Sequence, residues 1–323
     1  MIINRYCNYS ENTELRFGKD SFIGAFLWKI FSYGETFIGK ETCTQVKSKI
    51  LEAEEYRKFK NDTEKCLKEI YDNKKLPLFS SVEIEVINRC NGECPFCPVN
   101  KHDDIRKMKK MDEQLFKSII DQLGDLEYSG RLALHSNNEP FLDSRIIDFA
   151  KYAREHVPNA HLYMFTNGTL LTIDKFEQII PYLDQIVIDN YDDNLQLHEN
   201  AKAIHALCRK NMELDKKVQI HVRKIHEVLK TRGGQAPNNQ KRRVYDMSCV
   251  LPYKQMVIRP DGKLSFCCND AYGKYTMADL NKMTLIEAWY SPKYVKAREQ
   301  LRSGRKNIKI CRYCDTTPEP KVY

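Results

Sequence analysis

The residues of this 323-residue chain that could do metal or redox chemistry are its cysteines, of which there are twelve. Cys90, Cys94 and Cys97 lie close together, and five more follow residue 245. Those five are Cys249, Cys267, Cys268, Cys311 and Cys314. In a reducing compartment such thiols point to metal binding or redox chemistry rather than to disulfides.

The first group has a spacing that suits an iron–sulfur cluster. Cys90, Cys94 and Cys97 are four and three residues apart, so one loop can present all three sulfurs to a single cubane. A fully protein-ligated cubane needs four thiolates, so three leave one iron open for an exogenous ligand. The alternative is a zinc knuckle completed by a distant fourth ligand. Zinc sites usually use two pairs of cysteines, a pattern that this triplet lacks.

The second group supplies enough thiols for a complete site. Cys249, Cys267, Cys311 and Cys314 match the number of ligands of a fully ligated auxiliary cluster. A zinc ribbon with four cysteine ligands is the alternative, because zinc and iron–sulfur sites share ligand types. Cys268 is left over. It is either a small residue in a tight turn or a hydrogen-atom donor or alternate ligand.

Alternating strands and helices are expected to position the first group. Runs rich in β-branched and aromatic residues begin at residues 82, 131, 161, 185 and 217, and helical patterns lie between them. The 24 to 49 residues between these starts are the length of βα units. Such a series predicts a parallel sheet, with the active site at the carboxyl ends of its strands.

Two further regions flank this predicted sheet. Residues 1–79, with helix formers over Thr44–Tyr71, are expected to form a helical N-terminal extension. Residues 80–245 contain the strand and helix alternation and would form the parallel sheet. Residues 246–323, which include a hairpin signal and a helical pattern over Leu285–Leu301, are expected to form a small α+β domain.

Composition excludes several other classes of protein. A 42% hydrophobic share argues against wholesale disorder, and a net charge of +8 is weak evidence for nucleic-acid binding. The longest apolar stretch, Phe22–Phe31, is interrupted by Lys29 and is far shorter than the roughly 18 residues of a membrane span. The first twenty residues lack a signal-peptide core. The sequence therefore predicts a cytoplasmic protein with no membrane span and no nucleic-acid partner.

The triplet Cys90, Cys94 and Cys97, placed after the first strand of a partial barrel, resembles the radical S-adenosylmethionine (SAM) superfamily. The resemblance implies a partial (β/α)6 barrel and a [4Fe-4S] cluster whose open iron is chelated by the amine and carboxylate of SAM. Reductive cleavage of SAM would then yield a 5′-deoxyadenosyl radical that abstracts hydrogen. The resemblance also implies an electron donor such as flavodoxin or ferredoxin.

Three shorter matches support this resemblance. Phe96 occupies the position that packs near adenine in the family. Asn138 and Glu139 begin an Asn-Glu-Pro sequence similar to the family's Gly-Glu-Pro, in which the glutamate accepts a hydrogen bond from the methionyl ammonium. Thr166 and Asn167 begin a Thr-Asn-Gly turn of the kind that lines the same pocket. All three fall at or beside the predicted carboxyl ends of strands.

The C-terminal cysteines resemble the twitch domain, a shortened relative of the SPASM domain. That resemblance implies a second, auxiliary [4Fe-4S] cluster on Cys249, Cys267, Cys311 and Cys314. Over roughly residues 80 to 316 the chain is similar to twitch-domain dehydrogenases that act on aminocyclitols. Arg232, in an Arg-Gly-Gly sequence, matches an arginine of their substrate pocket. Because arginine stays charged, binding and polarising a hydroxyl is its expected role.

The implied function is a radical SAM oxidoreductase. It would oxidise a hydroxyl of a small polyol substrate, a sugar or aminocyclitol that is free or carrier-linked, to a ketone, and the auxiliary cluster would accept the second electron. One alternative is a redox-neutral carbohydrate epimerase in which Cys268 or Cys208 returns a hydrogen atom. Two others are a radical SAM peptide-modifying maturase and a zinc-containing interaction protein.

Overall fold

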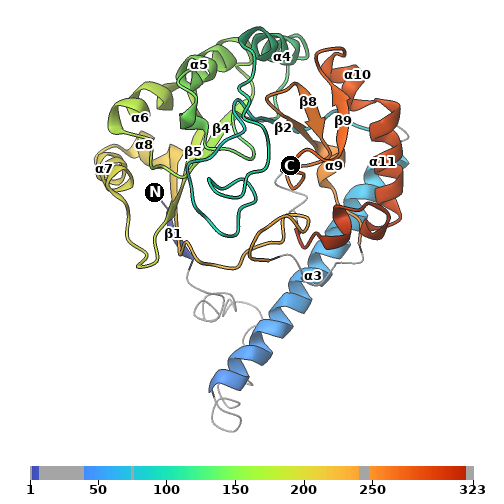
Figure 1. The fold of residues 1–323 in the computed structure, drawn as a ribbon, viewed down its shortest axis with the longest axis horizontal. Coiled ribbons are helices and arrows are strands. Elements are labelled where there is room, and N and C mark those ends of the chain that lie inside the picture. The colour runs from blue at the N-terminus through green and yellow to red at the C-terminus, as the bar shows by residue number, and fades with distance from the viewer. Residues whose placement is uncertain (1, 7–39, 74–75, 240–246, 318–323) are drawn as a thin grey trace.

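A computed structural model describes residues 2–6, 40–73, 76–239 and 247–317, with side chains from Tyr56 onward (Figure 1). Its centre is a nine-stranded sheet with the strand order β1-β6-β5-β4-β3-β2-β7-β8-β9. The strands are β1 (Ile2–Tyr6), β2 (Ser81–Ile84), β3 (Arg131–Ala133), β4 (His161–Thr166), β5 (Gln185–Tyr191), β6 (Val218–Arg223), β7 (Gln255–Ile258), β8 (Lys263–Ser265) and β9 (Thr276–Asp279). Neighbours from β1 to β7 pair in parallel, and β8 and β9 are antiparallel.

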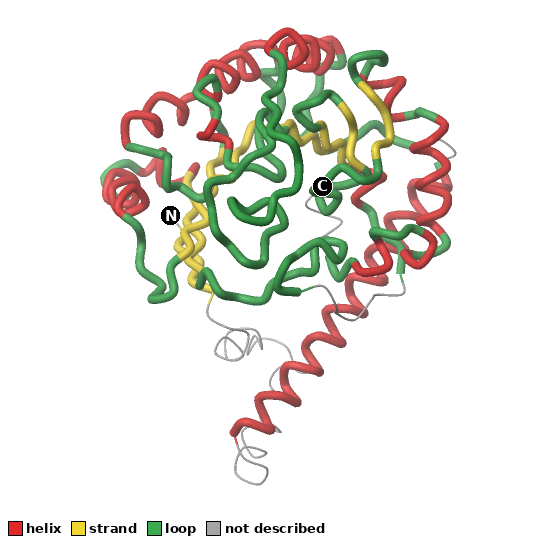
Figure 2. Tube along the Cα trace, in the orientation of Figure 1, coloured by secondary structure: helices red, strands yellow, loops and turns green. Residues whose placement is uncertain are grey.

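Helices follow most of the parallel strands. They are α3 (Lys40–Asp72), α4 (Glu113–Asp125), α5 (Ile146–His156), α6 (Ile173–Ile179), α7 (Glu199–Cys208), α8 (Met212–Lys217), α9 (Leu251–Lys254), α10 (Leu285–Trp289) and α11 (Pro292–Arg302). Short 3₁₀ turns cover Pro140–Leu142, Ile180–Tyr182, Arg305–Asn307 and Cys311–Tyr313. Figure 2 shows the helices outside an open arc of strands, with loops filling the open side. The structure is thus the α/β partial barrel that the sequence predicts, open rather than closed.

Alternation along the strands separates a helix-facing side from an inner side. On β2, Val82 and Ile84 are fully buried in the hydrophobic core. Glu83, between them, lines the cavity on the inner side instead. Side chains of a strand point alternately to its two faces, so every second residue of each strand faces the inside of the arc. The polar residues of the site come from these inner positions and from the loops that follow.

The N-terminal region contains more than the predicted helix. Helix α3 extends the Thr44–Tyr71 pattern, and its far end projects from the body in Figure 1. Cys66, Leu67 and Ile70 anchor it in the core. The expectation of a helical region was incomplete, however, because Ile2–Tyr6 form β1 and pair in parallel with β6. A five-residue strand with two adjacent isoleucines gives too short a pattern to signal its partner.

The C-terminal region shares the barrel's sheet. The predicted hairpin is present as β7 and β8, and β7 pairs in parallel with β2. The helix predicted over Leu285–Leu301 is wrong as one element, because the chain forms α10 and then α11. Ser291 has an extended backbone, and Pro292 begins the second helix, where its missing N–H costs nothing. No helix among the described residues is long and apolar enough to cross a membrane.

Candidate functional site

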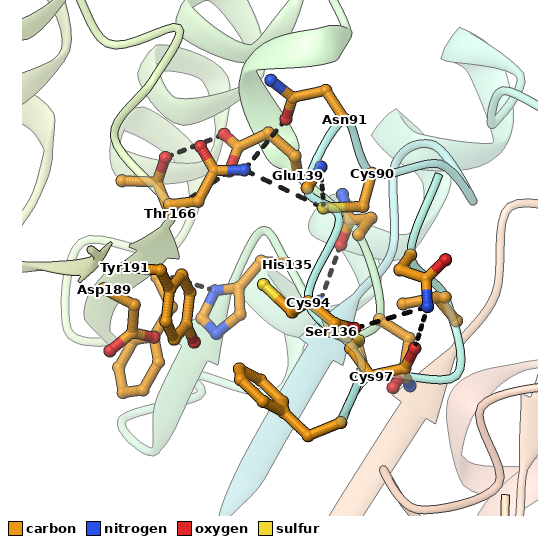
Figure 3. A pocket seen from close by; sticks show the side chains of 18 of the residues that line it. Cys90, Asn91, Cys94, Cys97, His135, Ser136, Glu139, Thr166, Asp189 and Tyr191 are labelled. Carbon is orange, nitrogen blue, oxygen red and sulfur yellow. Dashed lines mark hydrogen bonds between the residues drawn. The ribbon is translucent and has the colours of Figure 1, made fainter. Parts of the chain in front are cut away.

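A cavity of about 650 Å³ opens at the carboxyl ends of the parallel strands. It is lined by the first cysteine loop, by the strand ends and loops after β3, β4 and β5, and by residues 225–232 and 268. Figure 3 shows Cys90, Cys94 and Cys97 facing Thr166, Asp189 and Tyr191 across this space. Every cofactor-binding residue predicted from the sequence lines the cavity, together with Arg232 and the first three cysteines. The residues are Phe96, Asn138, Glu139, Thr166, Asn167, Arg232, Cys90, Cys94 and Cys97.

Two sulfurs of the first cysteine loop lie around Gly92. A Cβ atom built on Gly92 would lie 3.3 Å from the Cys90 sulfur, 3.7 Å from the Cys94 sulfur and 3.8 Å from the Asn167 amide nitrogen. The two sulfurs are therefore no more than 7.0 Å apart and share the space that a side chain at Gly92 would fill. Burial raises the pKa of the Cys90 and Cys94 thiols to about 12, so deprotonation there needs a metal.

This spacing suits a cluster better than a single ion. No three His, Cys, Asp or Glu side chains in the described part of the chain group closely enough to hold one metal ion. The sulfurs of Cys90 and Cys94 nonetheless converge on one space, and the backbone N–H of Cys97 donates to the Cys94 carbonyl at 3.0 Å. The donor set of three soft thiols on one loop fits an iron–sulfur cluster with one open iron.

Glu139 ties two strand ends together inside the cavity. Its Oε1 accepts hydrogen bonds from the Thr166 hydroxyl at 2.8 Å and the Phe141 backbone at 3.1 Å. Its Oε2 accepts from the Asn167 backbone N–H at 2.8 Å. Burial raises the pKa of Glu139 to about 7, although these hydrogen bonds act to lower it. The Glu139 backbone also donates to the carbonyl of Arg89, next to the first cysteine.

The other two predicted cofactor residues lie beside this network. Phe96 packs against Tyr191, with ring centroids 5.4 Å apart. The Asn138 side-chain oxygen accepts from the backbone of Ser136 at 2.9 Å, and its amide nitrogen is buried with no partner among the described residues.

Arg232 lies on a strained turn at the far side of the cavity. Its φ of 51° falls in the left-handed region, and Gly233 and Gly234 follow with φ of 67° and 79°. A Cβ on Gly233 would approach Ile310 to 2.7 Å, so the turn packs too closely for another side chain. The Arg232 guanidinium donates to Asn137 Oδ1, and its Nε is buried without a partner among the described residues.

Glu83 is a cavity residue that the sequence analysis missed. Its Oε2 accepts from the Ser136 hydroxyl and its Oε1 from the Gln255 amide, each at 2.6 Å. Burial raises its pKa to about 7, while Ser136 and the charges of Arg232 and Arg131 act to lower it. The sequence contained a signal for it. Residues 82–86, Val-Glu-Ile-Glu-Val, alternate apolar and acidic residues, which places the two glutamates on the strand face opposite the apolar one.

Three residues that line the cavity each hold a buried nitrogen with no partner in the described part of the chain. These nitrogens are Arg131 Nε, Asn138 Nδ2 and Arg232 Nε. Buried unpaired polar groups are rare in native proteins. Each of the three residues is only partly buried, so a ligand in the cavity would contact their exposed atoms rather than these nitrogens.

The second cysteine group is buried at the C-terminal end. Cys249, Cys267, Cys311 and Cys314 are each 7–8% exposed, and burial raises the pKa of the Cys267 and Cys311 thiols. Arg305, 1% exposed, lies beside them and donates to the Cys314 carbonyl at 2.9 Å.

Arg305 is a buried cation beside the second group. Burial lowers the pKa of Arg305, but the four neighbouring sulfurs, where they are charged, raise it above its ordinary value. A cation in this position fits thiolates bound to a metal cluster, whose negative charge it would offset.

The leftover cysteine joins the two sites. Cys268 lines the cavity, and its neighbour Cys267 belongs to the second group. The Cys268 carbonyl accepts from the Asn137 amide at 3.0 Å, and burial raises the pKa of its thiol. Cys208 is buried in the core on α7 and does not line the cavity, which removes it as a hydrogen donor. Cys7 and the side chain of Cys43 lie outside the described residues.

Comparison with known families and proteins agrees with this arrangement. Residues 84–225 match the Radical SAM superfamily, and residues 249–315 match SPASM, an iron–sulfur cluster-binding domain. The S-adenosyl-L-methionine-dependent 2-deoxy-scyllo-inosamine dehydrogenase of Niallia circulans is 28% identical over 240 residues. That similarity covers 74% of this chain and 93% of the relative.

Two solved structures have a similar fold. BtrN in complex with AdoMet and 2-DOIA superposes with a TM-score of 0.62 at 24% identity, covering 75% of this chain and 97% of that one. SuiB from Streptococcus suis, bound to S-adenosylmethionine, superposes with a TM-score of 0.51 at 13% identity, covering 91% and 83%. At these identities the superpositions show the fold alone.

Proposed function

We propose that this chain, a radical SAM enzyme with a C-terminal SPASM-type domain, oxidises a hydroxyl of a small polyol, a sugar or aminocyclitol, to a ketone. Its cofactors are a SAM-binding [4Fe-4S] cluster, S-adenosylmethionine and an auxiliary iron–sulfur cluster. The relative from Niallia circulans, named as a dehydrogenase of 2-deoxy-scyllo-inosamine, supports an aminocyclitol as the substrate class. We further propose residues 80–245 as the barrel and 246–323 as the auxiliary domain.

The position of Cys268 next to Cys267 supports an oxidation rather than a redox-neutral reaction. Cys268 forms part of the cavity wall, and the adjacent Cys267 belongs to the buried second group. Forming a ketone removes two electrons and two protons from the substrate, so a second electron acceptor has to lie near the first. A cluster on Cys249, Cys267, Cys311 and Cys314 would lie directly behind the cavity wall.

The proposed ligands follow from the two cysteine groups. Cys90, Cys94 and Cys97 would hold the SAM-binding cluster. When bound, the cofactors supply a 5′-deoxyadenosyl radical that takes a hydrogen atom and an auxiliary cluster that takes one electron. Asn138 would lie beside the bound SAM, and Glu139 would accept a hydrogen bond from its ammonium. These contacts hold the cofactor in one orientation beside the substrate.

Residues of the chain itself would bind the substrate and accept its proton. Arg131 and Arg232, which line the cavity, would donate from their exposed guanidinium nitrogens to hydroxyl oxygens, which suits a ligand with several hydroxyls. The Glu83 carboxylate, which both arginines influence, would accept the proton of the hydroxyl that becomes the ketone. A carboxyl whose pKa lies near 7 can take up that proton at physiological pH.

Anaerobic turnover tests this proposal. Reconstituted protein is incubated with SAM, dithionite and a panel of sugars, amino sugars, aminocyclitols and nucleotide-linked sugars. Mass spectrometry should detect a product that has lost a hydrogen pair, together with an equal amount of 5′-deoxyadenosine. If SAM is cleaved but no compound of the panel is oxidised, the proposal is wrong for small polyols.

A second candidate function rests on Cys268. Its thiol lines the cavity in its protonated form, because burial raises its pKa, and it could return a hydrogen atom to a substrate radical. That step would make the reaction a redox-neutral epimerisation. Turnover in D₂O separates the two functions: deuterium in a product of unchanged oxidation state indicates epimerisation. Under the main proposal Cys268→Ala still forms the ketone, whereas an epimerase would lose its turnover.

A further inference from the structure

A patch of exposed side chains lies on the segment that runs from the first cysteine loop to α4. The segment carries two apolar residues, 72% and 56% exposed, among exposed lysines. The residues are Ile105, Lys107, Met108, Lys109 and Lys110, which we call the return patch. Large apolar side chains held in water beside charged ones typically mark an interaction site.

The exposure of the return patch is built into the fold. Arg106, within the segment, turns inward and pairs with the buried Glu85 at 2.8 Å, and its side chain is only 9% exposed. The Asn88 side chain forms hydrogen bonds to the backbone on both sides of Met108. It donates to the Lys107 carbonyl at 2.8 Å and accepts from the Lys109 N–H at 2.7 Å. A rigid segment therefore presents these side chains to solvent.

The return patch is connected directly to the first cysteine loop. Arg89, which precedes Cys90, donates from its guanidinium to the Arg106 carbonyl. On the other side of the loop, the Asn100 amide donates to the Cys97 carbonyl at 2.9 Å. The segment that carries the patch is therefore tied by one hydrogen bond, at Arg106, to the residue that precedes Cys90.

We propose that the return patch docks an acidic one-electron carrier protein of the flavodoxin type, which reduces the cluster held by the first cysteine loop. The inference rests on the proposed function, because it requires that cluster. The carrier loses one electron and the cluster gains it, and no bond forms or breaks. The lysines would attract an acidic partner from a distance, and the chain's net charge of +8 adds to that attraction.

The size and chemistry of the patch suit a brief encounter. Redox partners associate through small interfaces, below about 1,200 Å² in total, because they must separate after each electron. Ile105 and Met108 would form the dry centre of such an interface, and the three lysines its charged rim. Charge attraction across a rim weakens as salt rises.

The test compares two sets of charge reversals in the reconstituted full-length enzyme. The patch variant is Lys107→Glu, Lys109→Glu and Lys110→Glu combined. The matched control reverses three exposed lysines around α10 and α11: Lys282→Glu, Lys293→Glu and Lys296→Glu. For each protein, binding of an acidic bacterial flavodoxin is measured by calorimetry at two salt concentrations. Reduction of the cluster by flavodoxin hydroquinone, and separately by dithionite, is followed by electron paramagnetic resonance.

We expect the patch variant to lose about tenfold or more in flavodoxin affinity and in the rate of flavodoxin-driven reduction. The control should stay within about twofold of the wild type, and dithionite should reduce all three proteins equally. Equal flavodoxin binding by the patch and control variants would overturn the docking proposal. A second variant, Ile105→Ser with Met108→Ser, should weaken binding without changing its salt dependence.

The reduction measurement separates this proposal from the proposed function. If dithionite-reduced enzyme cleaves SAM but oxidises no polyol, the substrate proposal fails while the docking result still stands. If the ketone forms with dithionite and the patch variant is reduced normally by flavodoxin, the docking proposal alone fails.

Discussion

Arg232 donates a hydrogen bond from its guanidinium to the side-chain oxygen of Asn137, which lies on the loop after a different strand. The Asn137 amide nitrogen in turn donates to the carbonyl of Cys268, at 3.0 Å. One asparagine thus holds the cavity arginine against the wall that leads to the second cysteine group. A change at Arg232 therefore acts first on the cavity and reaches the second cysteine group through Asn137.

Arg232→Lys should lower the rate of substrate oxidation about 10- to 100-fold. Lysine lacks the planar set of N–H donors of a guanidinium, so one hydrogen bond to the substrate would be lost. A hydrogen bond to a charged group contributes about 1.5–3 kcal/mol. Cleavage of SAM in the absence of substrate should stay near the wild-type rate. Chromatography with mass spectrometry measures both products. Arg209→Lys, at an exposed position after α7, is the control. Unchanged oxidation by Arg232→Lys would remove the arginine from the substrate site.

Glu83→Gln should weaken the pH dependence of oxidation. If Glu83 accepts the hydroxyl proton, its ionised form is the active one. Wild-type turnover should then rise as the pH increases through about 7. The glutamine variant should be slower by about 10²- to 10⁴-fold. It should keep only the weaker pH dependence that Glu139, whose pKa is also about 7, contributes through SAM binding. Glu93→Gln is the control, because hydrogen bonding and charge from Lys101 already hold the pKa of exposed Glu93 below its usual value.

The same substitution should stabilise the protein at high pH. Burial holds the pKa of Glu83 near 7, above its ordinary 4.5, so the folded state favours the protonated carboxyl. That contribution is fully present below pH 4.5 and is lost as the pH rises through 7. Glu83→Gln cannot ionise and should be more stable than wild type at pH 8 by up to about 3 kcal/mol, with no difference at pH 4. Urea unfolding of the cluster-free wild type and variant at both pH values measures this difference in the free energy of unfolding. A variant that is less stable than the wild type at pH 8 would contradict the argument from burial.

Gly92→Ala should selectively prevent loading of the first cluster. The added Cβ would lie within 3.7 Å of both the Cys90 and Cys94 sulfurs, in the space that a cluster needs. Iron and sulfide analysis after anaerobic reconstitution should therefore return about half of the wild-type content, since one of two cubanes is lost. Glu93→Ala, one residue along the same loop, should load normally. Full loading of the alanine variant would place the cluster elsewhere.

Arg305→Met should destabilise the loaded protein more than the cluster-free one. With thiolates bound to a cluster, the buried guanidinium offsets their negative charge, and removing one partner of such a pair costs about 3–5 kcal/mol. With neutral thiols, the cost should be smaller, since no charge pair is broken and hydrogen bonds such as that to the Cys314 carbonyl are lost in both states. Melting of both proteins with and without clusters measures the difference. An equal loss in both states would argue against a charged cluster beside Arg305.

Local features of this site could be predicted from the sequence because their geometry is local. Cys90, Cys94 and Cys97 share one loop, so their spacing alone places three sulfurs together. The short motifs at Glu139 and Thr166 could be predicted to lie at the same edge of the sheet, because parallel strands end on the same side. The structure joins these two residues by a hydrogen bond. The five barrel strands followed from β-branched runs at βα spacing.

Only the folded chain decides which distant residues share the cavity. Glu83, Arg232 and Cys268 come from three separate segments, and they meet because β2 is flanked by β3 and β7 in one curved sheet. Alternation along a strand separates its two faces, but the curvature of the sheet determines which face encloses a cavity. The turn at Arg232 likewise depends on the close approach of Gly233 to Ile310, a contact between residues far apart in the chain. Spacing in the sequence therefore determined the metal chemistry, and long-range packing determined where a substrate could meet it.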